Sequence, residues 1–78
     1  MRKLLITGRA IKKDIGPGFW GIINESGAEY RPINMPEQLK IEGAQVEVIV
    51  VEAHEDISIF MWGKPVHILS FTTPNVRV

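Results

Sequence analysis

Apolar and polar residues alternate along several short stretches of the chain, as they do in half-buried β-strands. The first such stretch runs from Arg2 to Lys12, and one of its faces is lined by small or apolar residues, namely Leu4, Ile6, Gly8 and Ala10. Because glycine tolerates a bulge or a bend within a strand, we predict one long strand that bends at Gly8 and can serve two sheets at once.

A β-hairpin is predicted in the first half of the chain. Two apolar or aromatic runs, Phe19–Ile23 and Ala28–Tyr30, flank Asn24–Gly27, whose residues favour turns. Pro32 has no backbone N–H group, so the second strand of the hairpin should end near it. Before the hairpin, the glycines and the proline of Asp14–Gly18 predict a loop.

A short helix is predicted in Asn34–Gly43, between the third and the fourth strand. Asn34 can cap the first turn, and Glu37, three residues on, completes a capping box. Gly43 suits the left-handed position that often follows the last turn of a helix. Leu39 would then face the core.

The clearest strand is Ala44–Ala53, where Val46, Val48 and Val50 fall on one face and the second half is apolar on both faces. The segment Ile57–Trp62 fits either a strand or a packed loop.

The end of the chain contains one more expected strand. Gly63–Pro65 predicts a turn, and Val66–Phe71 predicts a last strand that pairs with the one before it. The tail Thr72–Val78 is expected to fray.

Length and composition limit the class of protein. The 78 residues make a single domain, 1–78, with its core in residues 4–71. No stretch approaches the roughly 20 consecutive apolar residues of a membrane-spanning helix, so we expect a soluble protein without a membrane partner.

Basic and acidic residues number 9 each, which gives no net attraction for phosphate backbones or anionic lipids. Cysteine is absent, which is compatible with a reducing compartment, and a cytoplasmic location is expected.

The expected elements follow the order of an oligonucleotide/oligosaccharide-binding (OB) barrel: a long strand, a hairpin, a short helix, a strand and its hairpin partner. From Leu4 to Phe71 the layout therefore resembles OB-type barrels. We predict a mainly β protein, a small five-stranded antiparallel OB-like barrel with one short helix between strands 3 and 4. Another small barrel, such as an SH3-like one, stays open because element order does not fix connectivity.

Some short motifs resemble those of small uncharacterised prokaryotic domains. They are Trp20-Gly21, Tyr30-x-Pro32-x-Asn34-x-Pro36 and Met61-Trp62-Gly63-x-Pro65-Val66. This resemblance implies no known chemistry. The OB likeness concerns element order alone, so neither resemblance assigns a role to a residue.

Aromatic and basic residues make up the candidate binding site. OB barrels bind single strands by stacking bases on aromatic side chains beside a cationic groove. Neighbouring strand residues point to opposite faces, so one of Phe19 and Trp20 must pack inside. The candidate ligand- or partner-binding residues are Trp20, Tyr30, Arg31, Phe60, Trp62 and Lys64.

A protein or peptide partner is the first expectation for this site. Tryptophan, tyrosine and arginine are enriched at the centres of protein interfaces, and the neutral total charge argues against a dominant phosphate-binding surface. Single-stranded nucleic acid is the alternative. A third interpretation is that the aromatic side chains only fill the barrel and close its ends. The protein is expected to be a monomer or a weak dimer.

No catalytic site, metal site or cofactor is expected. The serines lack a local setting that would activate a nucleophile. His54–Asp56, together with Glu52 and His67, offers donors for a divalent metal, but three consecutive polar residues between apolar runs are more simply a solvated loop. We therefore expect a non-catalytic binding or interaction module.

Overall fold

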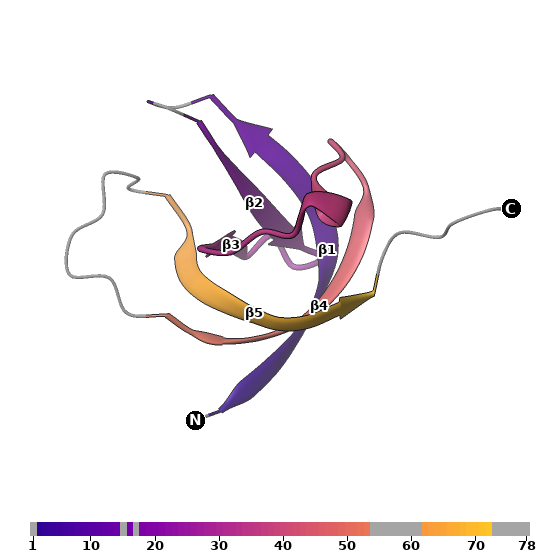
Figure 1. Ribbon diagram of the computed structural model, residues 1–78, viewed down its shortest axis with the longest axis vertical. Coiled ribbons are helices and arrows are strands. Elements are labelled where there is room, and N and C mark those ends of the chain that lie inside the picture. Colours follow the sequence, from indigo (N-terminus) through magenta and orange to yellow (C-terminus); the bar gives the residue numbers. More distant parts are fainter. Residues whose placement is uncertain (1, 15, 17, 54–61, 73–78) are drawn as a thin grey trace, which may run out of the picture.

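The protein folds as a closed ring of strands. The structure, a computed structural model, describes residues 2–14, 16, 18–53 and 62–72. These residues form five strands in the order β1-β2-β3-β5-β4, and β4 pairs again with β1 (Figure 1). The bounds are β1 (Lys3–Lys13), β2 (Phe19–Asn24), β3 (Glu29–Pro32), β4 (Gln45–Glu52) and β5 (Lys64–Thr72). The expected mainly β fold is confirmed.

The long first strand serves two neighbours, as the sequence predicts. Lys3 to Arg9 pair with β4, and Gly8 to Lys13 pair with β2. The two ladders overlap at Gly8 and Arg9. At Gly8 an added Cβ atom would lie 2.8 Å from the Cα atom of Asn24. Real Cβ atoms do not come that close to a backbone atom, so only glycine lets β1 approach β2 at this bend.

One pair of strands is parallel, so the prediction of a fully antiparallel barrel was wrong. β3 and β5 run in the same direction, with Tyr30 opposite Lys64 and Pro32 opposite Val66. The other pairings among the described strands are antiparallel. Strand directions can alternate all the way round a closed ring only if the number of strands is even. A ring of five strands must therefore contain a parallel pair.

The prediction of a short helix between β3 and β4 was also wrong. The segment holds a single 3-10 turn, η1 (Glu37–Leu39), which follows the extended residue Pro36 and has no side-chain cap. Asn34, the predicted cap, uses its amide on β5 instead. Its Nδ2 donates to the carbonyl oxygen of Ile68 at 3.0 Å, and its Oδ1 accepts from the N–H of Ile68 at 2.8 Å. This side chain continues the ladder between β3 and β5 past the end of β3 at Pro32.

The interior of the ring is filled mainly by branched aliphatic side chains. Val46, Val48 and Val50 are buried, as the alternation in β4 predicts, and Leu39 of η1 packs into the same cluster. The other buried members of this core are Ile6, Ala10, Ile22, Val66 and Ile68. The predicted inward position of Leu39 is thus correct, although it comes from a 3-10 turn.

The hairpin between β2 and β3 turns where the sequence predicts. Gly27 has a φ of 90°, which glycine adopts without strain, and its N–H donates to the carbonyl oxygen of Asn24 at 3.0 Å. The Oδ1 atom of Asn24 accepts from the N–H groups of Ser26 and Ala28 at 3.0 and 2.8 Å. One asparagine side chain therefore stabilises the whole turn.

β5 begins earlier than predicted. Lys64 and Pro65, expected in a turn, already pair with β3. A proline is tolerated near the start of a strand because the missing ladder donor is less costly there. Of the segment Ile57–Trp62, the residues before Trp62 lie outside the described residues, as does the tail beyond Thr72.

Candidate functional site

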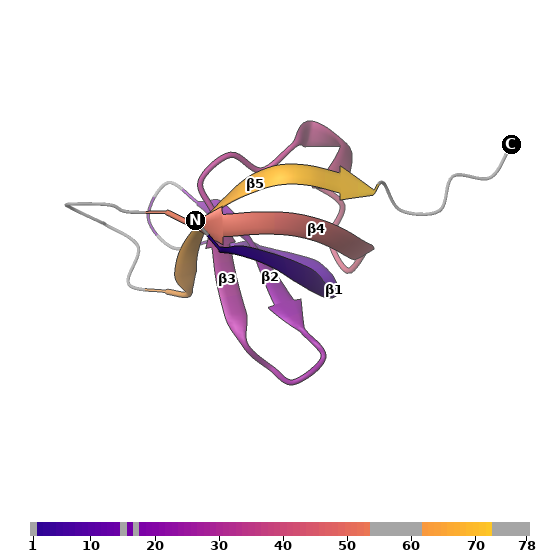
Figure 2. The ribbon, with the colours of Figure 1, turned by 90° about the horizontal axis from the view of Figure 1, so that it is seen from below.

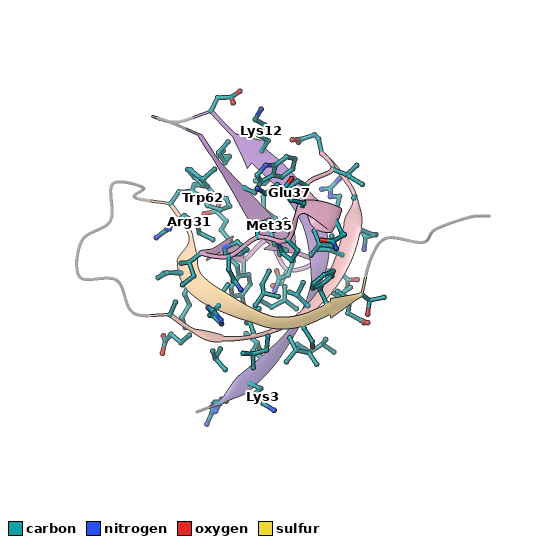
Figure 3. All side chains as sticks on the ribbon, in the orientation of Figure 1. Lys3, Lys12, Arg31, Met35, Glu37 and Trp62 are labelled. Carbon is teal, nitrogen blue, oxygen red and sulfur yellow. The ribbon has the colours of Figure 1, made fainter. Side chains whose placement is uncertain are left out.

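The parallel pairing of β3 with β5 brings together candidate residues that are far apart in the sequence. Tyr30 lies opposite Lys64, and Arg31 lies opposite Pro65. Trp62 lies two residues before β5, and Figure 3 shows it near Arg31 on the side of the molecule where β5 begins. Phe60, the remaining candidate from this segment, lies outside the described residues.

The indole ring of Trp62 occupies the space over Gly21 of β2. A Cβ atom on Gly21 would lie 2.5 Å from Cη2 of this ring, so a side chain larger than hydrogen would displace it. Phe19, on the same strand, packs against the indole with the ring centroids 5.6 Å apart and the planes at 47°. Such a tilted arrangement is favourable for two aromatic rings. Because Gly21 has no side chain, the indole of Trp62 can pack directly on β2, on the outside of the ring of strands.

Two cationic residues accompany Trp62. The Nζ atom of Lys13 lies 5.5 Å from the centroid of the indole, which is within the range of a cation–π interaction. Arg31 shares this outer face because its neighbour Tyr30 pairs with the core residue Ile22. Only 5% of Arg31 is exposed, so Lys13 presents more of its charge to solvent.

We call this surface the tryptophan face. It consists of Lys13, Phe19, Gly21, Arg31 and Trp62. Sequence reasoning placed Trp62 and Arg31 in the site but missed the role of Gly21. The dipeptide Trp20-Gly21 carried the only signal, because a glycine inside a strand often marks the close approach of another group.

Trp20 lies on the opposite side of β2 from the tryptophan face. It stands opposite Lys12 of β1, is half-buried and packs against the core. The expectation that one of Phe19 and Trp20 packs inside is confirmed, with Trp20 inward. The structure therefore separates Trp20 from Arg31 and Trp62, which lie on the other side of β2 and β3.

A pocket of about 500 Å³ lies beside the start of β1. Its lining residues are Arg2, Leu4, Tyr30, Val50, Glu52, Lys64 and Val66. At its rim, Nζ of Lys64 lies 3.2 Å from Oε2 of Glu52, and both side chains are more than half exposed. Exposed pairs of this kind contribute little to stability, so these two groups can rearrange around a ligand. Two of the candidate residues, Tyr30 and Lys64, thus line this pocket.

A further surface, which the sequence did not assign to a site, lies on the outside of β1, β4 and β5. Its large apolar side chains are well exposed: Leu5 at 59%, Leu69 at 48% and Ile49 at 37%. Leu5 pairs directly with Ile49, and Leu69 is the extra residue of β5 at the register shift beside Ile49. Phe71 pairs with the core residue Val48 and therefore lies on the other face of β5. Figure 2 shows these strands side by side. We call this surface the apolar face.

The described residues hold no group of three or more His, Cys, Asp or Glu side chains placed to bind a metal ion. Glu52 and His67 belong to this part of the chain, whereas His54–Asp56 lie outside it. Nor does the described part of the chain contain a helix of the length and apolarity needed to cross a membrane.

Comparison with known proteins gives no relative from which a role could be transferred. No family model matches the chain, and neither a curated protein nor a solved structure matches it. The site is interpreted below from its own geometry.

Proposed function

We propose that the protein is a non-catalytic binding module on an OB-like barrel, and that its tryptophan face binds a partner protein or peptide. The closed ring of five strands and the turn between β3 and β4 support the OB-like assignment. OB barrels bind their ligands on the face of strands 2 and 3 and with the loops beside it. The tryptophan face occupies the corresponding strands. A cytoplasmic location is part of the same proposal and suits a chain without cysteine.

The proposal rests on the position of Trp62. This side chain is half-buried and packs over Gly21, outside the core. An aromatic ring that is already held in place loses little conformational freedom when a partner covers it. Tryptophan is also among the residues that most often dominate the binding energy of an interface. Trp62 is therefore suited to be the centre of a contact surface.

Single-stranded nucleic acid is a second candidate, favoured by Phe19, Trp62 and Lys13. A base stacked on such a platform contributes about 1–3 kcal/mol, and a nearby cation can contact the phosphate. Against it, the chain has no net charge, and Arg31 is almost covered. The charges therefore favour a protein or peptide over a polyanion.

The test is a selection of short random peptides displayed on phage against the folded protein. We expect enriched peptides whose affinity falls at least about 30-fold for Trp62→Ala, the loss typical of a dominant interface residue. Ile41→Ala, a change at an exposed apolar residue outside the tryptophan face, is the control and should leave the affinity unchanged. Failure to enrich any peptide, or equal binding to Trp62→Ala, would contradict the proposal.

The nucleic-acid alternative is tested with oligothymidylate in a Trp20→Phe background, so that Trp62 is the fluorescent reporter. Quenching at low salt that disappears steeply as salt is added would support the alternative. Unchanged fluorescence at low salt would remove it.

A further inference from the structure

The apolar face is continuous across neighbouring strands. Leu5 of β1 and Ile49 of β4 lie side by side, and Leu69 of β5 lies next to Ile49. Val51, the next outward position on β4, is buried, so the exposed apolar surface of this strand ends at Ile49. A hollow of about 80 Å³ on this face is lined in part by Leu5, Glu47 and Ile49. Apolar patches of this kind mark interaction surfaces in soluble proteins.

A partner covers the middle of this surface by packing its own side chains on it. β4 is paired with β1 on one side and with β5 on the other, so its backbone has no free edge for an added strand. Two sheets pack face to face when apolar side chains of both interdigitate. The occupant of the apolar face is therefore expected to present an apolar surface of its own.

Opposite charges stand at the two ends of the apolar face. Lys3 precedes Leu5 by two positions on β1, and Glu47 precedes Ile49 by two positions on β4. Side chains two positions apart share one face of a strand. Because β1 and β4 are antiparallel, Lys3 and Glu47 lie at opposite ends of the paired residues Leu5 and Ile49. Both charged side chains are exposed.

This arrangement is complementary to itself. A twofold axis that runs across the strands, through Leu5 and Ile49, would bring the apolar centres of two copies together. The same rotation would place Lys3 of each copy next to Glu47 of the other. A surface that meets itself in this way forms a closed symmetric dimer. Arg9, which pairs with Gln45, stands farther from the axis than Glu47 and does not face Lys3.

We propose that the occupant of the apolar face is a second copy of this chain, which forms a homodimer through β1, β4 and β5. In the order of strands around the ring, β4 is separated from β2 and β3 by β1 and β5. The dimer therefore leaves both tryptophan faces uncovered. The inference does not depend on what the tryptophan face binds.

The first test measures the dimer dissociation constant of the full chain by sedimentation equilibrium. Ile49→Glu should raise this constant at least about 30-fold, because it places a charge at the centre of the interface. Ile41→Glu is the matched control, since Ile41 is 54% exposed but lies outside the apolar face, and it should not change the constant. A wild-type chain that stays monomeric at every concentration, or unchanged dimerisation of Ile49→Glu, would overturn the proposal.

A charge exchange tests the orientation of the two copies. Lys3→Glu and Glu47→Lys should each raise the dissociation constant about threefold to tenfold at low salt, since each puts like charges together twice in the dimer. The double variant restores both opposite-charge contacts and should return the constant to the wild-type value. Circular dichroism confirms that each variant is folded. A double variant weaker than either single one would exclude this arrangement.

Discussion

Asn34→Ala should destabilise the protein far more than a change at an exposed loop residue normally does. The side chain of Asn34 makes two hydrogen bonds to Ile68, one to the carbonyl oxygen and one from the N–H group. Ile68 is buried, so its backbone groups have limited access to water. Alanine removes both bonds and opens the ring of strands between β3 and β5, just beyond the last paired residue, Pro32.

The expected loss follows from these two bonds. One intramolecular hydrogen bond contributes about 1 kcal/mol net, and a buried group left without a partner costs about 1–3 kcal/mol. Partial access of water to this site keeps the sum near the lower end, so we expect a loss of about 2–3 kcal/mol in the free energy of unfolding. That is a large fraction of the roughly 5–15 kcal/mol that stabilises a typical domain. For a domain of this size the melting temperature should fall by roughly 10–20 °C.

Asn34→Asp separates the two bonds. An aspartate keeps an acceptor for the N–H of Ile68 but places a carboxylate oxygen against the carbonyl oxygen that Nδ2 now contacts. It should therefore be no more stable than Asn34→Ala at neutral pH. Urea unfolding followed by circular dichroism gives the free energy, with Gln38→Ala, a change at an exposed residue of η1, as the control. If Asn34→Ala unfolds within about 0.5 kcal/mol of wild type, the ladder role of Asn34 is refuted.

Three further changes test the roles of single residues. Gly8→Ala should cost more than about 3 kcal/mol, because the new Cβ atom meets the backbone of β2; a melting curve like that of wild type would contradict this. Gly21→Ala should lift the indole of Trp62 off β2. In a Trp20→Phe background, acrylamide should therefore quench the fluorescence of Trp62 more strongly. Equal quenching would show that the contact between Trp62 and Gly21 is unimportant. Asn24→Ala should cost about 1–2 kcal/mol and speed hydrogen exchange of the turn amides, whereas unchanged exchange would argue against its role in the hairpin.

The strands were predictable because their signals are local. Val48 and its neighbours alternate with polar residues, and that pattern alone placed β4 to within a residue at each end. Gly8 marked the bend in β1 because few other roles suit a glycine in a strand. The direction of β3 relative to β5 could not be predicted from a local signal. It follows from closing a ring of an odd number of strands and not from any short segment of sequence.

The role of a polar residue was harder to predict, because one side chain suits several settings. Asn34 carries the donor and acceptor of an amide, which can cap a helix or continue a ladder equally well. The choice depends on whether Ile68 comes within reach, and this is decided by the tertiary fold. In the same way, the alternation of side chains along a strand predicted that Trp20 and Phe19 lie on opposite faces. The packing of Trp62 over Gly21 could not be predicted so, because it depends on two distant segments meeting in space.

The closed ring also affects how the chain reaches its native state. The β2–β3 hairpin joins neighbouring segments, whereas β1 must find β4, and β3 must find β5, across long intervals of sequence. Such distant pairings slow folding. On the ribosome, Asn34 can make its two hydrogen bonds only after Ile68 has been synthesised. During that interval the unpaired edges of the incomplete sheet are open to other chains, so this stage of biogenesis carries the greatest risk of aggregation.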